Sequence, residues 1–200
     1  KAPEDLHSQV PLVEEFLSAL GVPSLRADRY EADDIIAGLA ARCKAEGRQC
    51  YILSSDKDLL QLVGDGVYQL RPSKAPNPQS GSAYELVDAS AVKAEWGVDP
   101  AKVLDLLALI GDSSDNVPGV KGVGEKTAVK LMARYGSLDE IYRNIAGVEG
   151  AVGRKLAEGR ESAYFSRSLI ELAYDAPVDV PSLDALSVER LDRCAGARML

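Results

Sequence analysis

Strand-forming patterns occur only in the first half of this 200-residue chain, and this asymmetry limits the possible folds more than any other feature. Apolar runs at residues 49–53, 67–70 and 84–87 predict three short β-strands. Helical spacing of apolar residues predicts helices at 6–20 and at 31–47, so helices and strands alternate. This alternation favours an α/β fold with a twisted, mainly parallel sheet flanked by helices.

From Asp88 onward the strand patterns end and only helical patterns remain. Ser137 and Glu140 match a capping box, a common start of a helix. The chain is therefore expected to form an α/β lobe at residues 1–97 and a helical lobe at residues 98–200. The expected helices span residues 88–96, 100–110, 124–135, 138–145, 151–158 and 161–173.

Seven carboxylates form three tight clusters at the ends of predicted elements. The first cluster opens a helix, the second follows a buried strand, and the third follows an apolar helix. Capping explains each cluster when it is taken alone, and for the first cluster capping and ligand binding are equally good explanations. The combination favours one shared crevice. The clusters are Glu31, Asp33 and Asp34; Asp56 and Asp58; and Asp112 and Asp115.

Carboxylates crowded into one crevice repel one another, and divalent cations relieve that repulsion. Oxygen ligands without nearby cysteine or histidine select hard ions such as Mg²⁺ or Mn²⁺, and the single histidine, His7, lies outside every cluster. Two such ions about 3.5–4 Å apart can hydrolyse a phosphodiester by activating water and stabilising the leaving oxygen. This chemistry needs no side-chain nucleophile, and none is evident in the sequence.

A glycine-rich turn follows the third acidic cluster and opens a predicted helix at residues 118–128. Gly119, Gly122 and Gly124 permit positive φ and let a phosphate approach the backbone, while the first amides of the helix point outward as donors. The glycine spacing differs from that of a nucleotide-binding loop, and no strand precedes it. A mononucleotide site is therefore not expected here.

A basic stripe runs along the helix that follows the turn. Lys126, Lys130 and Arg134 are four residues apart, and Lys121 lies in the turn itself. Such a stripe can be an ordinary solvated face. Next to an amide-rich turn, it is better explained as a grip on the phosphates of one DNA strand, which positions a substrate without reading its sequence.

The net charge of −8 and the pI near 4.8 argue at first against a nucleic-acid partner. Seven of the 31 acidic residues lie in the clusters, however, so bound metal would leave the rest of the surface nearly neutral. Three widely spaced cysteines, Cys43, Cys50 and Cys194, indicate buried free thiols in a reducing compartment. No apolar run approaches the ~18–20 residues of a membrane span. The first residue, Lys1, and the abrupt end suggest a piece of a longer protein.

Three motifs resemble the 5′-nuclease domain of bacterial DNA polymerase I, a relative of the flap endonucleases. They are Glu31-Ala-Asp-Asp34, the segment 55–61 (SDKDLLQ) and the long segment 111–127 (GDSSDNVPGVKGVGEKT). The resemblance covers residues 5–175, and the last motif is highly specific. It implies a PIN-like 5′-nuclease fold whose helical lobe contains a DNA-binding helix-three-turn-helix, with two or more divalent ions and a K⁺ ion at the hairpin.

The resemblance also implies roles for individual residues, with Asp34, Asp56 and Asp112 as catalytic residues. The implied activity is 5′-3′ exonuclease or 5′-flap endonuclease cleavage of branched or nicked duplex DNA, by a monomer in the bacterial cytoplasm associated with the nucleoid, with a polymerase domain linked to it. The implied metal ligands are Glu31, Asp33, Asp34, Asp56, Asp58, Asp112 and Asp115. The implied DNA-binding residues are Gly119, Lys121, Gly122, Gly124, Lys126, Thr127 and Lys130.

One departure from the family pattern keeps a second function open. Family members begin with a strand that bears an aspartate, then a further acid and a basic helical arch, all upstream of the position of Lys1. The alternative is therefore a catalytically incomplete, structure-specific DNA-binding module. A protein-interaction scaffold without a DNA role is a third and weaker hypothesis.

Overall fold

The computed structural model describes residues 4–73 and 82–198. These residues form two compact units. The first runs up to Gly38 and resumes at Ala173, and the second comprises Leu39–Leu172. These units are a different division of the chain from the two lobes expected at residues 1–97 and 98–200. The expected lobe boundary stays a prediction.

Helix α1 (Glu4–Leu20) opens the first unit, and the helix expected at residues 6–20 is confirmed. It ends at Gly21, whose φ of +75° lets Val22 N–H donate to Leu17 O at 2.9 Å. Helix α2 (Ala32–Ala45) begins in the same unit and continues into the second. The chain therefore starts as expected from its apolar periodicity.

The carboxyl-terminal stretch folds back beside the end of α1. It contains the short 3₁₀ helices η4 (Leu183–Leu186) and η5 (Val188–Arg190) and helix α9 (Arg193–Ala197), none of which was expected. Asp192 N–H donates to Leu20 O at 2.8 Å, and Gly196 leaves room for the Leu20 side chain. Cys194 of α9 is exposed, so the expectation of three buried thiols is wrong for this residue.

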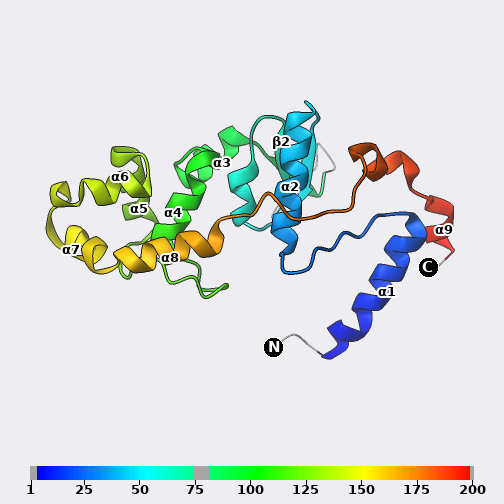
Figure 1. The fold of residues 1–200 in the computed structure, drawn as a ribbon, viewed down its shortest axis with the longest axis horizontal. Coiled ribbons are helices and arrows are strands. Elements are labelled where there is room, and N and C mark those ends of the chain that lie inside the picture. The colour runs from blue at the N-terminus through cyan, green and yellow to red at the C-terminus, as the bar shows by residue number, and fades with distance from the viewer. Residues whose placement is uncertain (1–3, 74–81, 199–200) are drawn as a thin grey trace. The chain divides into compact units, whose positions relative to one another are not determined.

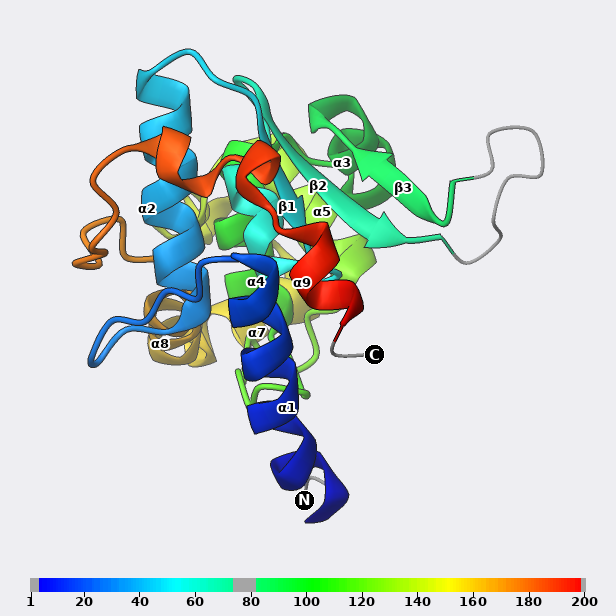
Figure 2. The same ribbon diagram turned by 90° about the vertical axis from the view of Figure 1, so that its right-hand side faces the viewer.

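The second unit holds a small mixed sheet in the order β1-β2-β3 (Figure 2). Strands β1 (Cys50–Leu53) and β2 (Val67–Pro72) pair in parallel, as expected, and β3 (Tyr84–Val87) pairs antiparallel with β2. The segment between β2 and β3 lies largely outside the described residues. The 3₁₀ helix η1 (Asp58–Leu62) follows β1.

Helices follow the sheet as predicted, and α4 lies at the centre of their packing. Leu106, Leu107 and Leu109 of α4 are at most 1 % exposed, and α4 packs against α5, α6 and α8 (Figure 1). Within the described residues, no helix has the length and apolar character to cross a membrane. The helices are α3 (Ala89–Trp96), η2 (Pro100–Lys102), α4 (Val103–Ile110), α5 (Glu125–Tyr135), α6 (Leu138–Arg143), η3 (Ile145–Gly147), α7 (Gly150–Glu158) and α8 (Arg160–Ile170).

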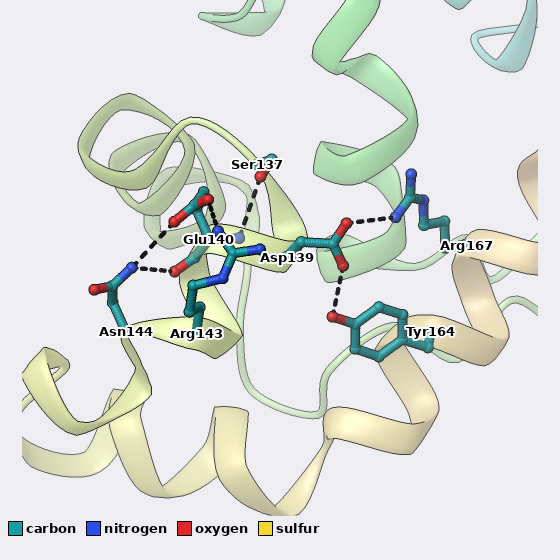
Figure 3. A network of polar contacts seen from close by, with 7 residues as sticks. All are labelled: Ser137, Asp139, Glu140, Arg143, Asn144, Tyr164 and Arg167. Atoms are coloured by element: carbon teal, nitrogen blue, oxygen red, sulfur yellow. Dashed lines mark hydrogen bonds and ion pairs between the residues drawn. The ribbon is translucent and has the colours of Figure 1, made fainter.

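A polar network ties α8 to the start of α6 (Figure 3). Asp139 accepts a hydrogen bond from Tyr164 Oη at 2.8 Å and pairs with Arg167 at 3.4 Å, and these contacts lower the pKa of Asp139. Ser137 Oγ accepts from Glu140 N–H at 3.2 Å, which confirms the serine half of the predicted capping box. The network thus links α8 to the first turn of α6.

Candidate metal centre and nucleic-acid interface

Four of the seven predicted acids gather in the second unit. Asp56, Asp112 and Asp115 line one hollow of about 400 Å³ together with Lys57 and three serines. Asp58 lies close enough to all three acids for their charges to act on its own carboxyl group. The structure thus brings together two clusters that are about 55 residues apart in the chain.

The end of β1 places the Asp56 cluster. The strand ends at Leu53, and Asp56 N–H then donates to Ser54 Oγ at 3.0 Å. The carboxylate of Asp56 accepts from Asp58 N–H at 2.9 Å, which starts η1. Gln69 of the neighbouring strand, which is only 1 % exposed, donates to Asp56 O at 2.6 Å. Both acids therefore occupy the carboxyl end of β1, the usual ligand edge of an open α/β sheet.

A tight loop places the Asp112 cluster. Asp112 and Val117 exchange both backbone hydrogen bonds, at 2.8 and 2.7 Å, and Asn116 adopts a φ of +57° inside the loop. Gly111, with a φ of +77°, precedes it because a Cβ there would lie 2.6 Å from Val117 O. The loop holds the Asp112 side chain inward, so that it is only 9 % exposed.

Asp58 has one carboxylate oxygen that is buried without a hydrogen bond from the described residues. Its Oδ1 is buried and, within the described part of the chain, has no hydrogen-bond donor. Burial, and next the charge of Asp56, raise the pKa of Asp58 to about 6. A buried carboxylate oxygen without a donor is a ligand that suits a hard cation, so this residue fits the predicted metal.

Asp112 has a counterion already. The Lys57 ammonium donates to Asp112 Oδ2, and Ser114 N–H donates to Oδ1 at 2.8 Å. The hydrogen bond from Lys57 is the main reason that the pKa of Asp112 lies well below its usual range. Asp115 responds in the opposite sense, because its hydrogen bond to Asp112 raises its pKa.

The side chains of the hollow do not form a complete set of metal ligands in the part of the chain that the structure describes. Across residues 4–73 and 82–198, no three His, Cys, Asp or Glu side chains are arranged to hold one metal ion. Lys57 occupies an oxygen of Asp112 that an ion would need. The donor set consists of oxygens and fits Mg²⁺ or Mn²⁺, but the ligand and catalytic roles of these acids stay predictions.

The first acidic cluster lies in the first unit, where the Asp34 carboxylate bonds to two backbone amides. Asp34 Oδ2 accepts from Glu31 N–H at 3.1 Å, and Oδ1 accepts from Ala173 N–H at 2.8 Å. Asp33 and Asp34 both fall in the first turn of α2. Capping therefore accounts for Asp34, and the convergence of this cluster with the other four acids stays a prediction.

The glycine-rich turn opens α5 as predicted. Gly119 and Gly122 have φ values of +60° and +80°, which favour glycine. Val120 N–H donates to Leu109 O at 2.9 Å, so the turn is tied back to the end of α4. Gly124 then precedes the first turn of α5 and accepts from Thr127 N–H at 2.9 Å. The turn is thus a fixed backbone loop between two packed helices.

Helix α5 has an exposed basic face and a buried apolar face, as the basic stripe predicted. Lys126, Lys130 and Arg134 are exposed and Thr127 is half-buried, whereas the opposite face packs into the core. Lys121 and Gly122 are exposed in the turn, while Gly119 is buried. The buried residues of the opposite face are Ala128, Leu131 and Met132.

A second hollow, of about 850 Å³, lies beside the turn and contains a cation that sequence reasoning missed. Lys121 and Gly122 line it from the turn, and Lys155 and Ser162 line it from α7 and α8. Lys155 Nζ donates to Gly122 O at 3.1 Å. The contact joins residues that are 33 positions apart, so no local sequence pattern could indicate it.

Comparisons with known proteins cover almost the whole chain. Residues 1–97 match the family model described as 5′-3′ exonuclease, N-terminal resolvase-like domain, and residues 98–194 match 5′-3′ exonuclease, C-terminal SAM fold. DNA polymerase I of Treponema pallidum (strain Nichols) is 46 % identical over 199 residues, which are 100 % of this chain and 19 % of that protein. The 5′-3′ exonuclease of Aquifex aeolicus (strain VF5) is 38 % identical over 192 residues, which are 96 % of this chain and 62 % of that protein.

A solved structure shares the fold. T5 5′-exonuclease with bound divalent zinc ions superposes with a TM-score of 0.67 at 19 % identity, covering 100 % of this chain and 70 % of that one. At this identity the likeness concerns the fold alone. Together with the two family models, it confirms the expected fold class, a resolvase-like α/β part followed by a helical part.

Proposed function

Because the chain belongs to the 5′-3′ exonuclease family, we propose that it hydrolyses DNA phosphodiesters from 5′ ends or at 5′ flaps with the help of divalent metal ions. One observation carries the proposal. The loop that holds Asp112 in the acidic hollow runs directly into the glycine turn and the basic face of α5. Acids suited to cations thus lie one loop away from a backbone suited to phosphate.

The proposed metal centre uses the seven clustered acids as oxygen ligands of two or more Mg²⁺ or Mn²⁺ ions. Bound ions of this kind activate the attacking water and stabilise the leaving oxygen. Asp58 contributes a buried oxygen that lacks a donor, and Asp112 contributes a carboxylate kept ionised by Lys57. Release of Lys57 from Asp112 would accompany metal binding, since one oxygen cannot serve both cations fully.

The proposed substrate is branched or nicked duplex DNA with a 5′ flap. Lys121, Lys126 and Lys130 would contact phosphates together with the amides of the turn, independently of base sequence. A K⁺ ion at the hairpin carbonyls would add to this grip. A linked polymerase domain belongs to the proposal, in keeping with relatives named DNA polymerase I. A monomeric state and a place in the bacterial cytoplasm near the nucleoid complete it.

Cleavage of a 5′-flap duplex in Mg²⁺ tests the proposal, with the chain assayed alone and with an upstream extension. We expect Asp112→Asn to abolish most of the cleavage while DNA affinity changes little, because the lost charge acts on the metal and not on the DNA. Asp99→Asn is the matched control, since Asp99 pairs with Lys93 at 3.0 Å and does not line the acidic hollow. Metal-independent cleavage, or cleavage that survives Asp112→Asn, would contradict the proposal.

A DNA-binding module without catalysis is the second candidate. Two observations favour it: Asp34 uses both carboxylate oxygens for backbone caps, and Lys57 already neutralises Asp112. Calorimetric titration with Mn²⁺ separates the two candidates, because a pure binding module has no tight divalent site. A scaffold without a DNA role would require that Lys126→Ala and Lys130→Ala leave DNA binding unchanged at low salt.

A further inference from the structure

We propose that Ser162 and Ser166 of α8 are positioning residues that hold the phosphate-binding turn in register with the acidic loop. They do so by binding both backbone groups of Gly119, the residue at which the turn and the loop meet. The inference rests on the function proposed above and names residues that determine which phosphodiester reaches the acids. Neither serine belongs to the predicted site, and neither contacts the acids.

The two serines bind Gly119 from the same face of α8. Gly119 N–H donates to Ser166 Oγ at 2.9 Å, and Ser162 Oγ donates to Gly119 O at 2.6 Å. Ser166 is fully buried, with 0 % exposure. Residues four apart on a helix lie on one face, so the two hydroxyls act as a pair. Buried backbone groups need partners, and here those partners come from 43 and 47 residues further along the chain.

Gly119 is a close-packed junction. A Cβ at this position would lie 2.4 Å from Gly111 N and 2.5 Å from Ile110 C, so the turn packs backbone against backbone on the end of α4. The acidic loop leaves from Gly111 and returns at Val117, where it is closed by its hydrogen bonds to Asp112. A displacement of Gly119 would therefore change the separation between the carboxylates and the amides of the turn.

Helix α8 also contacts the other acidic segment. Gln61 Nε2 donates to Ile170 O at 3.1 Å at the end of α8, and to Asp58 O at 2.8 Å. Asp139 of α6 also contacts α8, through Tyr164 and Arg167 (Figure 3). Helix α8 thus contacts both the segment that contains Asp58 and the glycine-rich turn, and links the positions of the two.

Loss of the two serine hydroxyls should disturb the position of the bound DNA relative to the acids more than the affinity for DNA or metal. The lysines of the turn and of α5 remain, so DNA binding persists, and the four acids remain, so metal binding persists. The position of the phosphodiester relative to the acids becomes less defined. Because a misplacement of about 1 Å can cost about 100-fold in rate, modest loosening of the turn is sufficient for a large effect.

Localised oxidative cleavage of DNA measures this register directly. Fe²⁺ takes the place of the divalent ion, and ascorbate with peroxide generates radicals that cut an end-labelled flap duplex near the ion. We expect radicals generated at the wild-type protein to cut the labelled DNA strand within a narrow window of nucleotides. The double variant Ser162→Ala/Ser166→Ala should cut over a window at least about twice as wide, with dissociation constants for DNA and Mn²⁺ changed by less than about threefold.

Ser168→Ala is the matched control, because Ser168 lies on the same helix and its hydroxyl donates to Phe165 O at 2.7 Å. It should cut as the wild type does. The single variants Ser162→Ala and Ser162→Thr cover the case in which the double variant fails to fold, as seen by near-ultraviolet circular dichroism. Threonine restores the hydroxyl and should restore the narrow window.

The outcomes separate this inference from the proposed function. If the serine variants cut in the same narrow window as the wild type, the positioning role is wrong while metal-dependent DNA binding stands. If the wild type itself binds neither Fe²⁺ nor the duplex, both the inference and the proposed function fall. If Ser168→Ala broadens the window as much as Ser162→Ala, the effect is a general loosening of α8 and the specific role is wrong.

Discussion

At the scale of single residues, Lys57 decides the charge state of the acidic hollow. Its ammonium contacts Asp112 inside the hollow, and its side chain is 28 % exposed. An ion pair that is partly removed from water is stronger than a surface pair, so Lys57 competes with any cation for the same oxygen. Lys57, which lies between Asp56 and Asp58 in the chain, thus balances part of the negative charge of the hollow in the metal-free protein.

We expect Lys57→Met to raise the affinity of the chain for Mn²⁺. Without its ammonium partner, Asp112 is free to bind an incoming ion, and methionine keeps the length of the apolar stem. Calorimetric titration measures the change, with Lys93→Met as the control because Lys93 pairs with Asp99 instead. Weaker Mn²⁺ binding in Lys57→Met would show that Lys57 organises the site and does not compete for it.

Asp58 provides a prediction about pH in the metal-free protein. Its pKa is raised to about 6 from the model-compound value of 3.8, so the folded state binds its proton more tightly than the unfolded state does. The contribution of Asp58 to stability therefore increases as the pH falls from 7 through 6 toward 4.

Urea unfolding in EDTA at pH 7 and pH 5 measures this effect. Asp58→Asn should be more stable than the wild type at pH 7, by about 1–2 kcal/mol once solvent screening is allowed for, and the difference should shrink at pH 5. Asp99→Asn serves as the control for removing an exposed carboxylate. An equal difference at both pH values would argue against a raised pKa at Asp58.

At the scale of elements, the turn depends on helices that follow it in the chain. Gly122 lies against Lys155 of α7, since a Cβ on Gly122 would be 2.6 Å from Lys155 Nζ. Gly136, at the end of α5, also has a positive φ, of +89°, but a Cβ there would meet nothing within 4 Å. The two glycines share the same backbone requirement and differ only in their surroundings.

We expect Gly122→Ala to weaken DNA binding and Gly136→Ala to leave it unchanged. Both substitutions strain the backbone and should each destabilise the protein by about 1–2 kcal/mol. Only the first also displaces Lys155 and the carbonyl that Lys155 contacts in the glycine-rich turn. Fluorescence anisotropy with a labelled flap duplex at low salt compares the variants, and equal weakening in both would place the effect in stability alone.

At the scale of the whole molecule, the proposed metal binding would be linked to folding. The Asp56 and Asp112 segments are close only in the folded chain, so an ion that they share binds the native state and stabilises it. At an ion concentration of 100 times the dissociation constant, the gain is about 2.7 kcal/mol. Stability therefore reports on the metal site even where activity is absent.

We expect Mn²⁺ to raise the thermal unfolding midpoint of the chain and EDTA to reverse the effect. Asp56→Asn should reduce the rise, because it removes one ligand from the hollow, whereas Asp99→Asn should not. Differential scanning calorimetry measures the midpoints. A midpoint that does not respond to Mn²⁺ would indicate that the acids do not share an ion.

The sequence by itself determined the local elements and the family. Apolar periodicity predicted α1, the strands and the two faces of α5, because those patterns depend on residues a few positions apart. Side-chain capping by Ser137 likewise follows from neighbouring residues. The long motif at residues 111–127 predicted the family that the comparisons confirm.

Only the tertiary structure decided which distant groups meet. The pairing of Lys57 with Asp112 joins residues 55 positions apart, and the bonds from α8 to Gly119 span more than 40. Such contacts depend on how helices pack around α4 and leave no periodic trace in the sequence. Pairing distant residues requires the free energy of the whole core, so these partners are defined only once the chain has folded.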